Sequence, residues 1–374
     1  MPEVRPVASR AEAEAFLRLP RMLGGEAAGW PVPLLFDARR FFDPGFNGAL
    51  RDNAVQRFLA WRGGRPVGRI TASHRLADPV GGVGNFGFPM LERDPAILAA
   101  LLRAAGGWLA AQGAGRLRGP LSLTINHEVG CQVAGFEQPP MVRMPRNPPW
   151  LPAMLEAAGL VAEKDVLACT LTLAGECHRA RFARALARWP GAPALRIRPL
   201  DPRRFDADIR LATDLYNDAW AENWGAVPVG AAEAATIARI MRPLLRSGAI
   251  LFAEWQGEPI GVLSLIPNLE EATAGLDGRL LPFGWWRVAR VALLGRGASG
   301  RVPMLGVSRR LRHHPASAMA VGALLDRAIG IAAARGWQRL EISWVLEDNA
   351  AMLHTMARLP APVTGRWRIY GGSL

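Results

Sequence analysis

The sequence predicts a mixed α/β (α+β) fold with a mixed sheet, built from two tandem copies of one structural unit. Residues 58–74 and 251–267 each contain a strand, a Gly/Pro turn and a second strand, which is a hairpin pattern. A long Ala/Leu-rich helix follows each hairpin, at 95–113 and 316–336, and each ends at a glycine. The same order of elements therefore occurs twice, as in an internal repeat with helices on both faces of a sheet.

The remaining elements of each copy are shorter. A strand follows the long helix at 116–126 in the first copy and at 337–349 in the second. A short helix comes next in each copy, at 147–160 and at 349–359. Further helices are expected at 10–19, 203–221 and 231–247.

The length of the chain indicates two domains. At 374 residues it exceeds what one ordinary core holds. A proline- and glycine-rich stretch within 176–200 predicts a linker. We therefore expect an N-terminal domain at 1–175 and a C-terminal domain at 201–374.

Composition narrows the class of protein. Half of the residues are hydrophobic, but no run of 18 apolar residues predicts a membrane span, and the first residues lack a signal core. We expect a cytoplasmic protein. The odd number of cysteines without a CxxC pattern predicts reduced thiols at Cys131, Cys169 and Cys177. The adjacent pair His313–His314 does not share a helix face, so no metal is expected.

The net charge of +13 favours acidic partners. All but one of the 45 basic residues are arginines, the exception being Lys164. CoA phosphates, anionic lipid and nucleic acid are the candidate classes. Nucleic acid is not expected, because the arginines are scattered and form no basic stripe with stacking aromatics. The sequence does not indicate an oligomeric state.

Six segments carry a resemblance to a known superfamily. They are NHEVGCQVAGFEQPPMV at 126–142, NPPWLPAMLEAAGL at 147–160, YNDAWAENWGAVPV at 216–229, GRLLPFGWW at 278–286, ISWVLEDNAAM at 342–352 and RWRIYGG at 366–372. Together they resemble tandem bacterial proteins of the GNAT (N-acetyltransferase) superfamily. The resemblance implies a CoA-dependent N-acyltransferase in which the strands on either side of the long helix splay apart. The acyl-pantetheine lies in that opening, and the pyrophosphate lies at the helix N-terminus.

The resemblance implies a CoA site in the second copy. The superfamily pattern at this helix start corresponds here to Arg312-His-His-Pro315-Ala-Ser317. Pro315 departs from the pattern because it has no N–H to donate. The implied contacts are Val307, Arg309, Arg310, Arg312, Ser317 and Asn349. The alternative for these arginines is a solvated loop. In the first copy 87–98 carries acids, so that copy is expected to be non-catalytic.

Acyl transfer to an amine requires a base and an acid. Glu347 and Asp348 end the strand at 337–349, where carboxylates can attract a cationic amine. Helix capping is the alternative for this polar group, and Asn349 suits it best. The candidate bases also include His313 and His314, with phosphate contact or surface exposure as alternatives. Members of the superfamily often use a Tyr in the last helix to protonate the leaving thiolate. The corresponding position in this sequence is near Met356, so water or His354 would have to supply that proton.

Residues 216–229 predict the acceptor wall. Three aromatic, two amide and two acidic side chains lie there, in the place where the superfamily's first two helices meet. The candidate contacts are Asn217, Trp220, Glu222, Asn223 and Trp224. The alternative is a helix end with tryptophans packed in the core.

Residues 281–301 carry four arginines and no acid, which suits a helix on an anionic membrane surface. Within 284–296 we expect the apolar residues to contact the acyl chains of the membrane lipids, and Arg287 and Arg290 to contact the lipid headgroups. These apolar residues are Trp285, Trp286, Val288, Val291 and Leu294. A buried core helix is the alternative.

A membrane surface would make the substrate lipid-like, with a long-chain acyl-CoA and a lipid amine such as a sphingoid base. That combination is found in bacterial ceramide synthases of GNAT type. Two alternatives stay open: a decayed binding or scaffold protein, and a short-chain N-acetyltransferase acting on a soluble amine.

Overall fold

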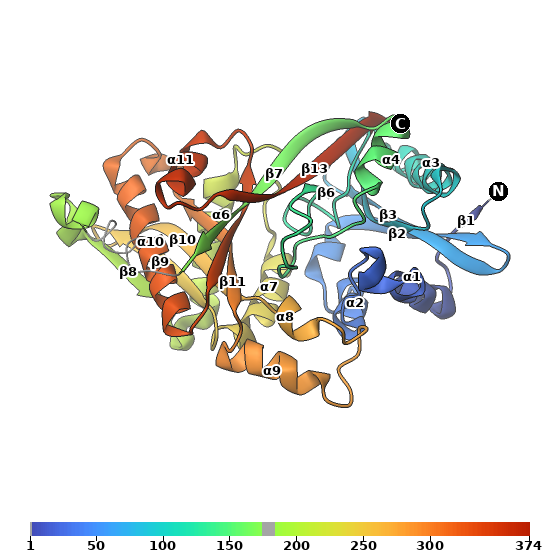
Figure 1. The fold of residues 1–374 in the computed structure, drawn as a ribbon. Helices are drawn as coiled ribbons and strands as arrows, with labels where there is room; N and C mark the ends of the chain where they lie inside the picture. The colour runs from blue at the N-terminus through green and yellow to red at the C-terminus, as the bar shows by residue number, and fades with distance from the viewer. Residues whose placement is uncertain (1, 174–183) are drawn as a thin grey trace. The chain divides into compact units, whose positions relative to one another are not determined.

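The chain forms two compact units in a computed structural model that describes residues 2–173 and 184–374 (Figure 1). Unit 1 comprises Met1–Leu167, Thr273–Leu281 and Gly365–Leu374, and unit 2 comprises Ala168–Ala272 and Pro282–Thr364. The units thus differ from the expected division at 1–175 and 201–374. Two segments of the C-terminal half belong to unit 1: Thr273–Leu281, between α8 and α9, and most of β13 with the C-terminus. Cys177 lies outside the described residues.

Unit 1 is a mixed sheet with helices on both faces. Its strands, in spatial order, are β1 (Glu3–Pro6), β2 (Asn53–Arg62), β3 (Arg65–Arg75), β4 (Val83–Leu91), β5 (Arg116–Gly119) and parts of β13 (Val363–Ser373) and β7 (Val161–Thr172), with β6 (Cys131–Ala134) paired to β13. The helices are α1 (Arg10–Met22) and α2 (Leu35–Phe41), which pack on one face, and α3 (Pro95–Ala111) and α4 (Leu151–Ala157), which pack on the other. Short 3₁₀ helices lie at Gly25–Ala28 and Gly48–Arg51.

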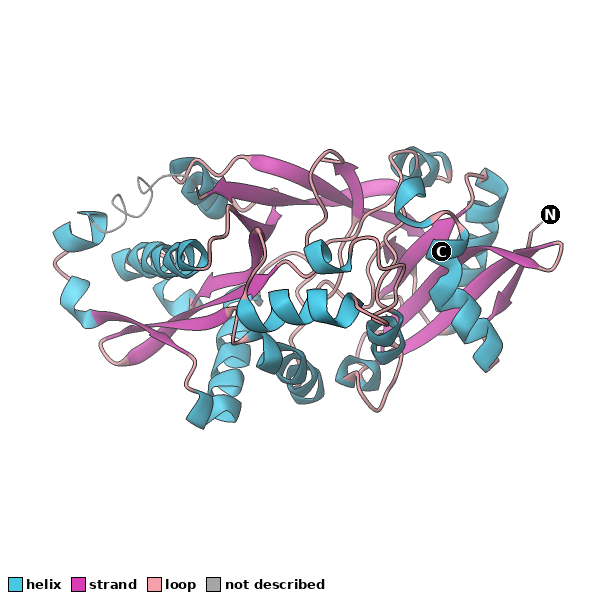
Figure 2. Ribbon diagram, turned by 60° about the horizontal axis from the view of Figure 1, so that its bottom comes forward, coloured by secondary structure: helices cyan, strands magenta, loops and turns pink. Residues whose placement is uncertain are grey.

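Unit 2 repeats this plan, and Figure 2 shows the strands with helices on either side. Its strands, in spatial order, are β8 (Leu195–Pro199), β9 (Ala249–Trp255), β10 (Glu258–Pro267), β11 (Ser299–Val307), β12 (Arg339–Leu346) and the end of β7. Its helices are α6 (Phe205–Trp220), α7 (Ala231–Leu244), α8 (Glu270–Thr273), α9 (Gly284–Leu294), α10 (Pro315–Ala334) and α11 (Ala350–Arg358), with 3₁₀ turns at Ala192–Ala194, Pro202–Arg204 and η5 (Arg309–Leu311).

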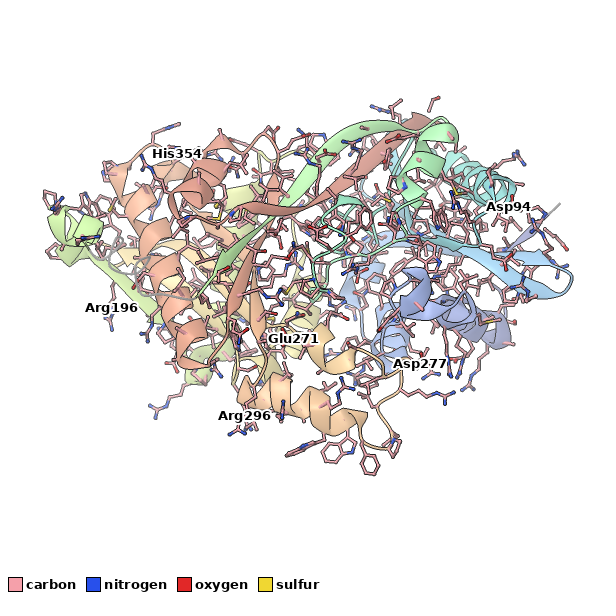
Figure 3. The ribbon with its side chains drawn as sticks, in the orientation of Figure 1. Asp94, Arg196, Glu271, Asp277, Arg296 and His354 are labelled. Atoms are coloured by element: carbon pink, nitrogen blue, oxygen red, sulfur yellow. The ribbon has the colours of Figure 1, made fainter. Side chains whose placement is uncertain are left out.

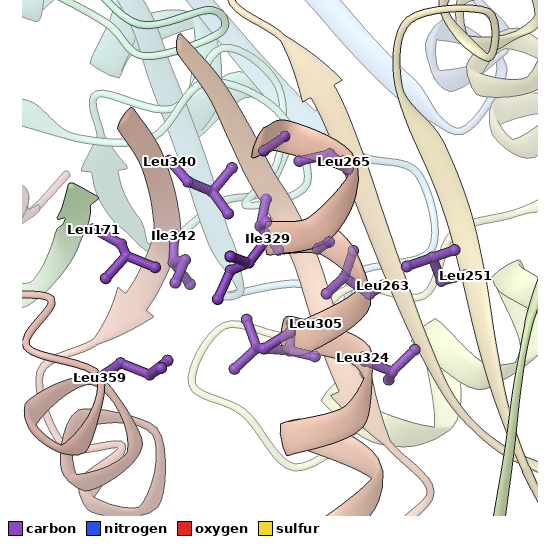
Figure 4. Close-up of a cluster of buried hydrophobic side chains, with 14 of the residues drawn as sticks. Leu171, Leu251, Leu263, Leu265, Leu305, Leu324, Ile329, Leu340, Ile342 and Leu359 are labelled. Carbon is purple, nitrogen blue, oxygen red and sulfur yellow. The ribbon is translucent and has the colours of Figure 1, made fainter. Parts of the chain in front are cut away.

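Alternation along the strands divides the core of unit 2 between the two faces of the sheet. On β9, Leu251 points to the face covered by α10 and α11 (Figure 4), whereas Ile250 and Phe252 point to the face covered by α6 and α7. Leu340 and Ile342 of β12 are buried on the α10 face. The sheet therefore leaves the alternate residues of β12 on the α6 face.

The predicted hairpins and long helices are confirmed. The hairpins are β2–β3 and β9–β10, both antiparallel. Both long helices, α3 and α10, begin with a proline at the first helical position, where its missing N–H costs nothing. Gly113 and Gly336 follow their ends at positive φ, which favours glycine as a helix stop.

Three predicted elements need correction. The strand expected at 116–126 ends at Gly119, because Pro120 cannot donate to a ladder and the next residue, Leu121, donates its N–H to Phe86 O at 2.7 Å. The linker expected at 176–200 contains a strand, β8, which pairs with β9. The helix expected at 147–160 is shorter, running over Leu151–Ala157.

Helix α10 is also, among the described residues, the one helix long and apolar enough to cross a membrane. Half of its most apolar stretch is buried, and its Leu324, Leu325 and Ile329 lie in the core of unit 2. Its packing is that of a core helix.

Candidate active site

The two central strands of unit 2 pair at one end and separate at the other. The parallel pairing of β11 with β12 runs from Ser299 with Arg339 to Val302 with Ile342. Both strands continue beyond it, and β11 stays paired to β10 as far as Val307. Pro303 follows the last pair and has no N–H to offer a neighbour. Beyond Val302 and Ile342 the two strands therefore no longer pair with each other, which is the position at which the resemblance implies an opening.

A buried charged cluster lies where the pairing ends. Arg301 and Glu341 face each other in the register, and the Arg301 side chain is 3% exposed. Arg301 Nε donates to Ser343 Oγ at 2.9 Å, and Ser343 Oγ donates to Glu341 Oε1 at 2.7 Å. The guanidinium also lies over the Trp344 ring, 5.2 Å from its centroid. We call the three hydrogen-bonded residues, without Trp344, the Arg301–Ser343–Glu341 cluster.

Burial raises the pKa of Glu341, while Arg301 and the Ser343 hydroxyl act in the opposite direction. A carboxylate with a raised pKa is a better proton acceptor than an exposed one. The Arg301 charge keeps the ionised form accessible inside the sheet. The cluster is therefore suited to accept a proton beside the strand opening.

The turn after β11 brings predicted phosphate and acceptor residues together. Arg309 donates to Asp218 Oδ1 at 3.2 Å and to Glu222 Oε1 at 3.1 Å, and Arg312 donates to Glu222 Oε2 at 2.6 Å. Arg310 is paired with Glu258 at 3.7 Å. Every one of these side chains is exposed or partly exposed. Glu222, expected at the acceptor wall, is thus bound to the arginines expected at phosphate.

Hydrogen bonds within the chain already occupy much of the backbone at the start of α10. His314 caps the helix, since its Nδ1 accepts from Ala316 N at 3.1 Å, and Ser317 N donates to His314 O at 2.9 Å. Pro315 has no N–H. His313 and His314 are both exposed, and the ring of His314 packs on Trp255 with centroids 4.6 Å apart. An anion here would be bound mainly by side chains.

The end of α6 forms an aromatic wall beside β11. Trp220 stacks on Tyr216 with centroids 4.7 Å apart, and its ring lies where a Cβ on Gly306 would come within 2.3 Å. Asn217 holds the following loop, because its amide both donates to Val229 O and accepts from Val229 N. Asn223 N donates to Trp220 O in the turn that also contains Trp224.

The polar end of β12 is exposed at Glu347 and Asp348. Asn349 caps α11, with its Oδ1 accepting from Met352 N at 3.1 Å, so the capping predicted for it is confirmed. Met356 is buried in the core, and His354 lies on the exposed side of α11 (Figure 3). The residues that follow β12 and the Arg301–Ser343–Glu341 cluster between β11 and β12 are thus two separate groups.

Sequence reasoning missed Arg301 and Glu341. The available signal was a charged residue at an alternating position of an otherwise apolar strand, with Leu340 and Ile342 on either side of Glu341. Partnership with Arg301 could not be read from the sequence, because it depends on the register between β11 and β12.

Two further predictions concern thiols and metals. Cys131 and Cys169 are buried free thiols, as expected. Burial raises the pKa of Cys169 to about 11, so it is not a ready nucleophile. No group of three or more His, Cys, Asp or Glu residues suited to a metal occurs in the described part of the chain.

Comparison with known sequences gives two relatives that match over nearly the whole chain. The bacterial ceramide synthase of Caulobacter vibrioides is 34% identical over 375 residues, covering 99% of this chain and 97% of that protein. Protein YghO of Escherichia coli is 31% identical over 375 residues, covering 98% and 94%. No family model matches the chain.

Comparison with solved structures gives the same fold. A tandem GNAT protein from the clavulanic acid biosynthesis pathway covers 100% of this chain and 98% of its own, with TM-score 0.57 and 15% identity. A GCN5-related N-acetyltransferase from Sphaerobacter thermophilus covers 100% and 95%, with TM-score 0.52 and 13% identity. A probable N-acyltransferase from Enterococcus faecalis covers 99% and 72%, with TM-score 0.53 and 9% identity.

Proposed function

The chain belongs to the family of GNAT-fold N-acyltransferases that includes the bacterial ceramide synthase of Caulobacter vibrioides, and we propose that it moves an acyl group from acyl-CoA to a primary amine. The acceptor we propose is a lipid amine such as a sphingoid base, and the donor a long-chain acyl-CoA. The relative's name and its full-length match support this substrate class. The observation that carries the proposal is the opening between β11 and β12 with a buried carboxyl at its closed end.

The opening suits an extended acyl-pantetheine. Beyond Val302 and Ile342 the facing edges of β11 and β12 no longer pair with each other. The amides of a pantetheine arm can hydrogen-bond such an edge as an added strand does. We place catalysis in unit 2 for this reason, with unit 1 as a non-catalytic copy.

The chemistry needs a proton acceptor. The amine nitrogen attacks the thioester carbonyl, a C–N bond forms, and the C–S bond breaks to release CoA thiol. We assign the proton lost by the amine to Glu341, with Ser343 and Arg301 as positioning residues. Water supplies the proton to the departing thiolate, because His354 lies on the exposed side of α11 and Met356 in the core.

The CoA phosphates would contact Arg309, Arg310 and Arg312 by replacing the carboxylates that pair with these arginines. Exposed ion pairs contribute little to stability, so a phosphate can replace Glu222 at small cost. Trp220 and Tyr216 would form the apolar wall for the acceptor. A lipid acceptor implies that the enzyme acts as a peripheral protein on an anionic membrane surface, which we place at the cytoplasmic side of the inner membrane.

Titration calorimetry with acyl-CoAs of increasing chain length tests this proposal. We expect binding that strengthens with chain length, and an N-acylated product by mass spectrometry when a sphingoid base is added. Tight binding of acetyl-CoA alone, with turnover of a soluble amine, would favour the short-chain alternative. No binding at any chain length would contradict the proposal.

A further inference from the structure

Helix α9 keeps several large apolar side chains in solvent. Phe283 is 80% exposed and Trp286 57%. The exposed set is Phe283, Trp285, Trp286, Leu293 and Leu294. Exposed apolar residues on an ordinary protein surface are scattered singly. Five of them on one short segment therefore indicate a binding surface.

The opposite side of α9 is fixed to the fold of unit 2. Val291 is buried, Ser247 Oγ donates to Ala292 O at 2.5 Å, and Trp337 Nε1 donates to Gly295 O at 2.9 Å. The expectation that Val291 faces lipid is therefore wrong. Trp286 and Leu293 share the outward side, being seven residues apart, and the buried-helix alternative does not describe that side.

The charge around this side is basic. Arg290 and Arg296 are exposed and form no ion pair with the residues that the structure describes, and Arg296 lies just after α9 (Figure 3). Arg301, counted with them in the sequence, is buried in β11 and does not contribute to this surface. No acid occurs on α9. The helix therefore combines an apolar outward side with cations.

A pocket beside α9 adds three more arginines. Arg239 and Arg242 of α7 line it with Arg246, which follows α7, and with Phe205 of α6 and Leu293 of α9. Arg242 lies over the Phe205 ring, 4.6 Å from its centroid. One acid, Asp206, also lines the pocket. The pocket thus offers guanidinium groups next to apolar side chains, a combination that suits a lipid phosphate.

We propose that these residues of α7 and α9, the α7–α9 surface, dock unit 2 on an anionic phospholipid bilayer. Tryptophan favours the membrane interface, and an amphipathic helix with arginines binds where apolar burial and anionic headgroups coincide. The arginines of the α7 pocket bind lipid phosphates next to the inserted rings. The inference rests on the proposed function in taking the acceptor to be a membrane lipid, which docking brings to the enzyme.

Co-sedimentation of the full chain with vesicles tests the proposal. We expect binding to phosphatidylcholine vesicles that contain phosphatidylglycerol, little binding to phosphatidylcholine alone, and loss of binding in high salt. Protein that stays in the supernatant with both vesicles overturns the proposal, as does equal binding to both. A salt-sensitive dimer formed through these residues without vesicles would identify a second copy as the occupant instead.

Surface variants show which residues are responsible. Trp285→Ser/Trp286→Ser should abolish vesicle binding, with Leu294→Ser as a milder second variant. Arg242→Gln/Arg246→Gln/Arg290→Gln should weaken it roughly 100-fold, at about fivefold for each arginine near an anionic surface. A control variant, Arg196→Gln/Arg327→Gln, removes two exposed arginines of β8 and α10 and should bind as wild type.

Activity on a detergent-dispersed amine separates this proposal from the proposed function. All of these variants should keep wild-type turnover in detergent and a wild-type melting temperature. Vesicle binding without turnover in the wild type would leave docking intact and contradict the acyltransferase proposal. If the surface variants bind vesicles as tightly as wild type, the docking proposal is contradicted and the acyltransferase proposal is not.

Discussion

The strand pair β4–β5 of unit 1 and the pair β11–β12 of unit 2 begin alike and end differently. Val83 pairs with Arg116 as Ser299 pairs with Arg339, and both pairs are parallel. In unit 2 the strands then separate. In unit 1 the chain after β5 turns across β4, and Leu121 N donates to Phe86 O at 2.7 Å. Only one of the two copies thus keeps an opening.

The segment that closes the opening of unit 1 is held from several sides. Leu123 O accepts from Ser73 Oγ at 3.1 Å and from Asn85 Nδ2 at 2.9 Å, and Leu121 and Leu123 are buried. By register, Asn85 and Arg118 occupy the places that Arg301 and Glu341 hold in unit 2. Unit 2 therefore has the Glu341 carboxyl at the end of the opening. Unit 1 has the Arg118 cation at that place, beside a space that Leu121 and Leu123 fill.

The helix starts differ in the same sense. The N-cap of α3 is Asp94, whose side chain accepts from Ala96 N at 2.8 Å and is paired with Arg62 (Figure 3). The N-cap of α10 is His314, which follows a turn that carries three arginines. A carboxylate at the helix N-terminus occupies the favourable position of an anion, so unit 1 has no place there for a phosphate. The comparison supports the proposal that acyl-CoA binds to unit 2 and not to unit 1.

Replacing Glu341 tests where the base lies. We expect Glu341→Gln to lower kcat/KM by about 10²- to 10⁴-fold, the usual contribution of a general base. Because burial raises the pKa of Glu341, wild-type activity should be present above that raised pKa and lost as the pH falls through it. The variant should lack this acid limb. Steady-state kinetics across pH measure both effects.

The control lies in unit 1. Glu163 binds Arg118, the residue at the place of Glu341, with Oε2 2.7 Å from Arg118 Nε. Glu163→Gln should leave kcat/KM and its pH profile unchanged. If Glu341→Gln keeps full activity with the acid limb intact, the base is elsewhere and the cluster is a structural ion pair.

Adding a methyl group to each copy should separate stability from catalysis. A Cβ on Gly87 would lie 2.3 Å from Leu121 O, a backbone atom that cannot move freely. Gly87→Ala should lower the stability of unit 1 by about 1–3 kcal/mol, the usual cost of overpacking. We expect a lower melting temperature in calorimetry, with kcat unchanged below that temperature.

The matched change in unit 2 is Gly306→Ala. Its Cβ would meet the Trp220 ring, a side chain on the proposed acceptor wall, at 2.3 Å. We expect a raised KM for the amine and a smaller loss of stability, because a side chain can shift where a backbone carbonyl cannot. An unchanged KM would argue that Trp220 does not line the acceptor site.

The arginines after β11 should matter for CoA and not for shorter donors. Arg309→Gln/Arg312→Gln should raise KM for acyl-CoA about fivefold to tenfold, since exposed charge pairs are weak. An acyl-pantetheine without the nucleotide should show no such change. The control is Arg62→Gln/Arg65→Gln in the β2–β3 hairpin, where these arginines pair with Asp94 and Glu92 before α3, and it should leave both KM values as they are. Equal effects on both donors would contradict phosphate contact.

Most of this fold can be predicted from the sequence because the elements of the repeat are determined by local sequence patterns. Hairpins and long helices follow from alternation, turn glycines and helix ends, which act over a few residues. The early end of β5 and the strand β8 were missed, since each depends on a partner elsewhere: Leu121 crosses to Phe86, and β8 pairs with β9. Local signals do not encode such partners.

The site is less predictable for the same reason. Asn349 was expected to cap α11 because capping is a local rule, and it does. The ion pair between Arg309 and Glu222 joins two helix ends far apart in sequence, and Arg301 meets Glu341 through strand register. Polarity at the end of a strand is visible in the sequence, whereas a charge buried within it is recognised only through its partner.

The carboxylates at the end of β12 provide the finest test. Glu347 and Asp348 are exposed, so Glu347→Gln and Asp348→Asn should leave kcat/KM close to the wild-type value, since exposed charges interact weakly. Asn349→Ala should lower stability by about 1 kcal/mol through loss of the cap, without a change in the pH profile. Kinetics and calorimetry on the three variants compare the strand end with the Arg301–Ser343–Glu341 cluster. A large loss of activity for Asp348→Asn at wild-type melting temperature, with Glu341→Gln still active, would move the base to the strand end. The opening between β11 and β12 would then bind the donor, and the chemistry would lie at its mouth.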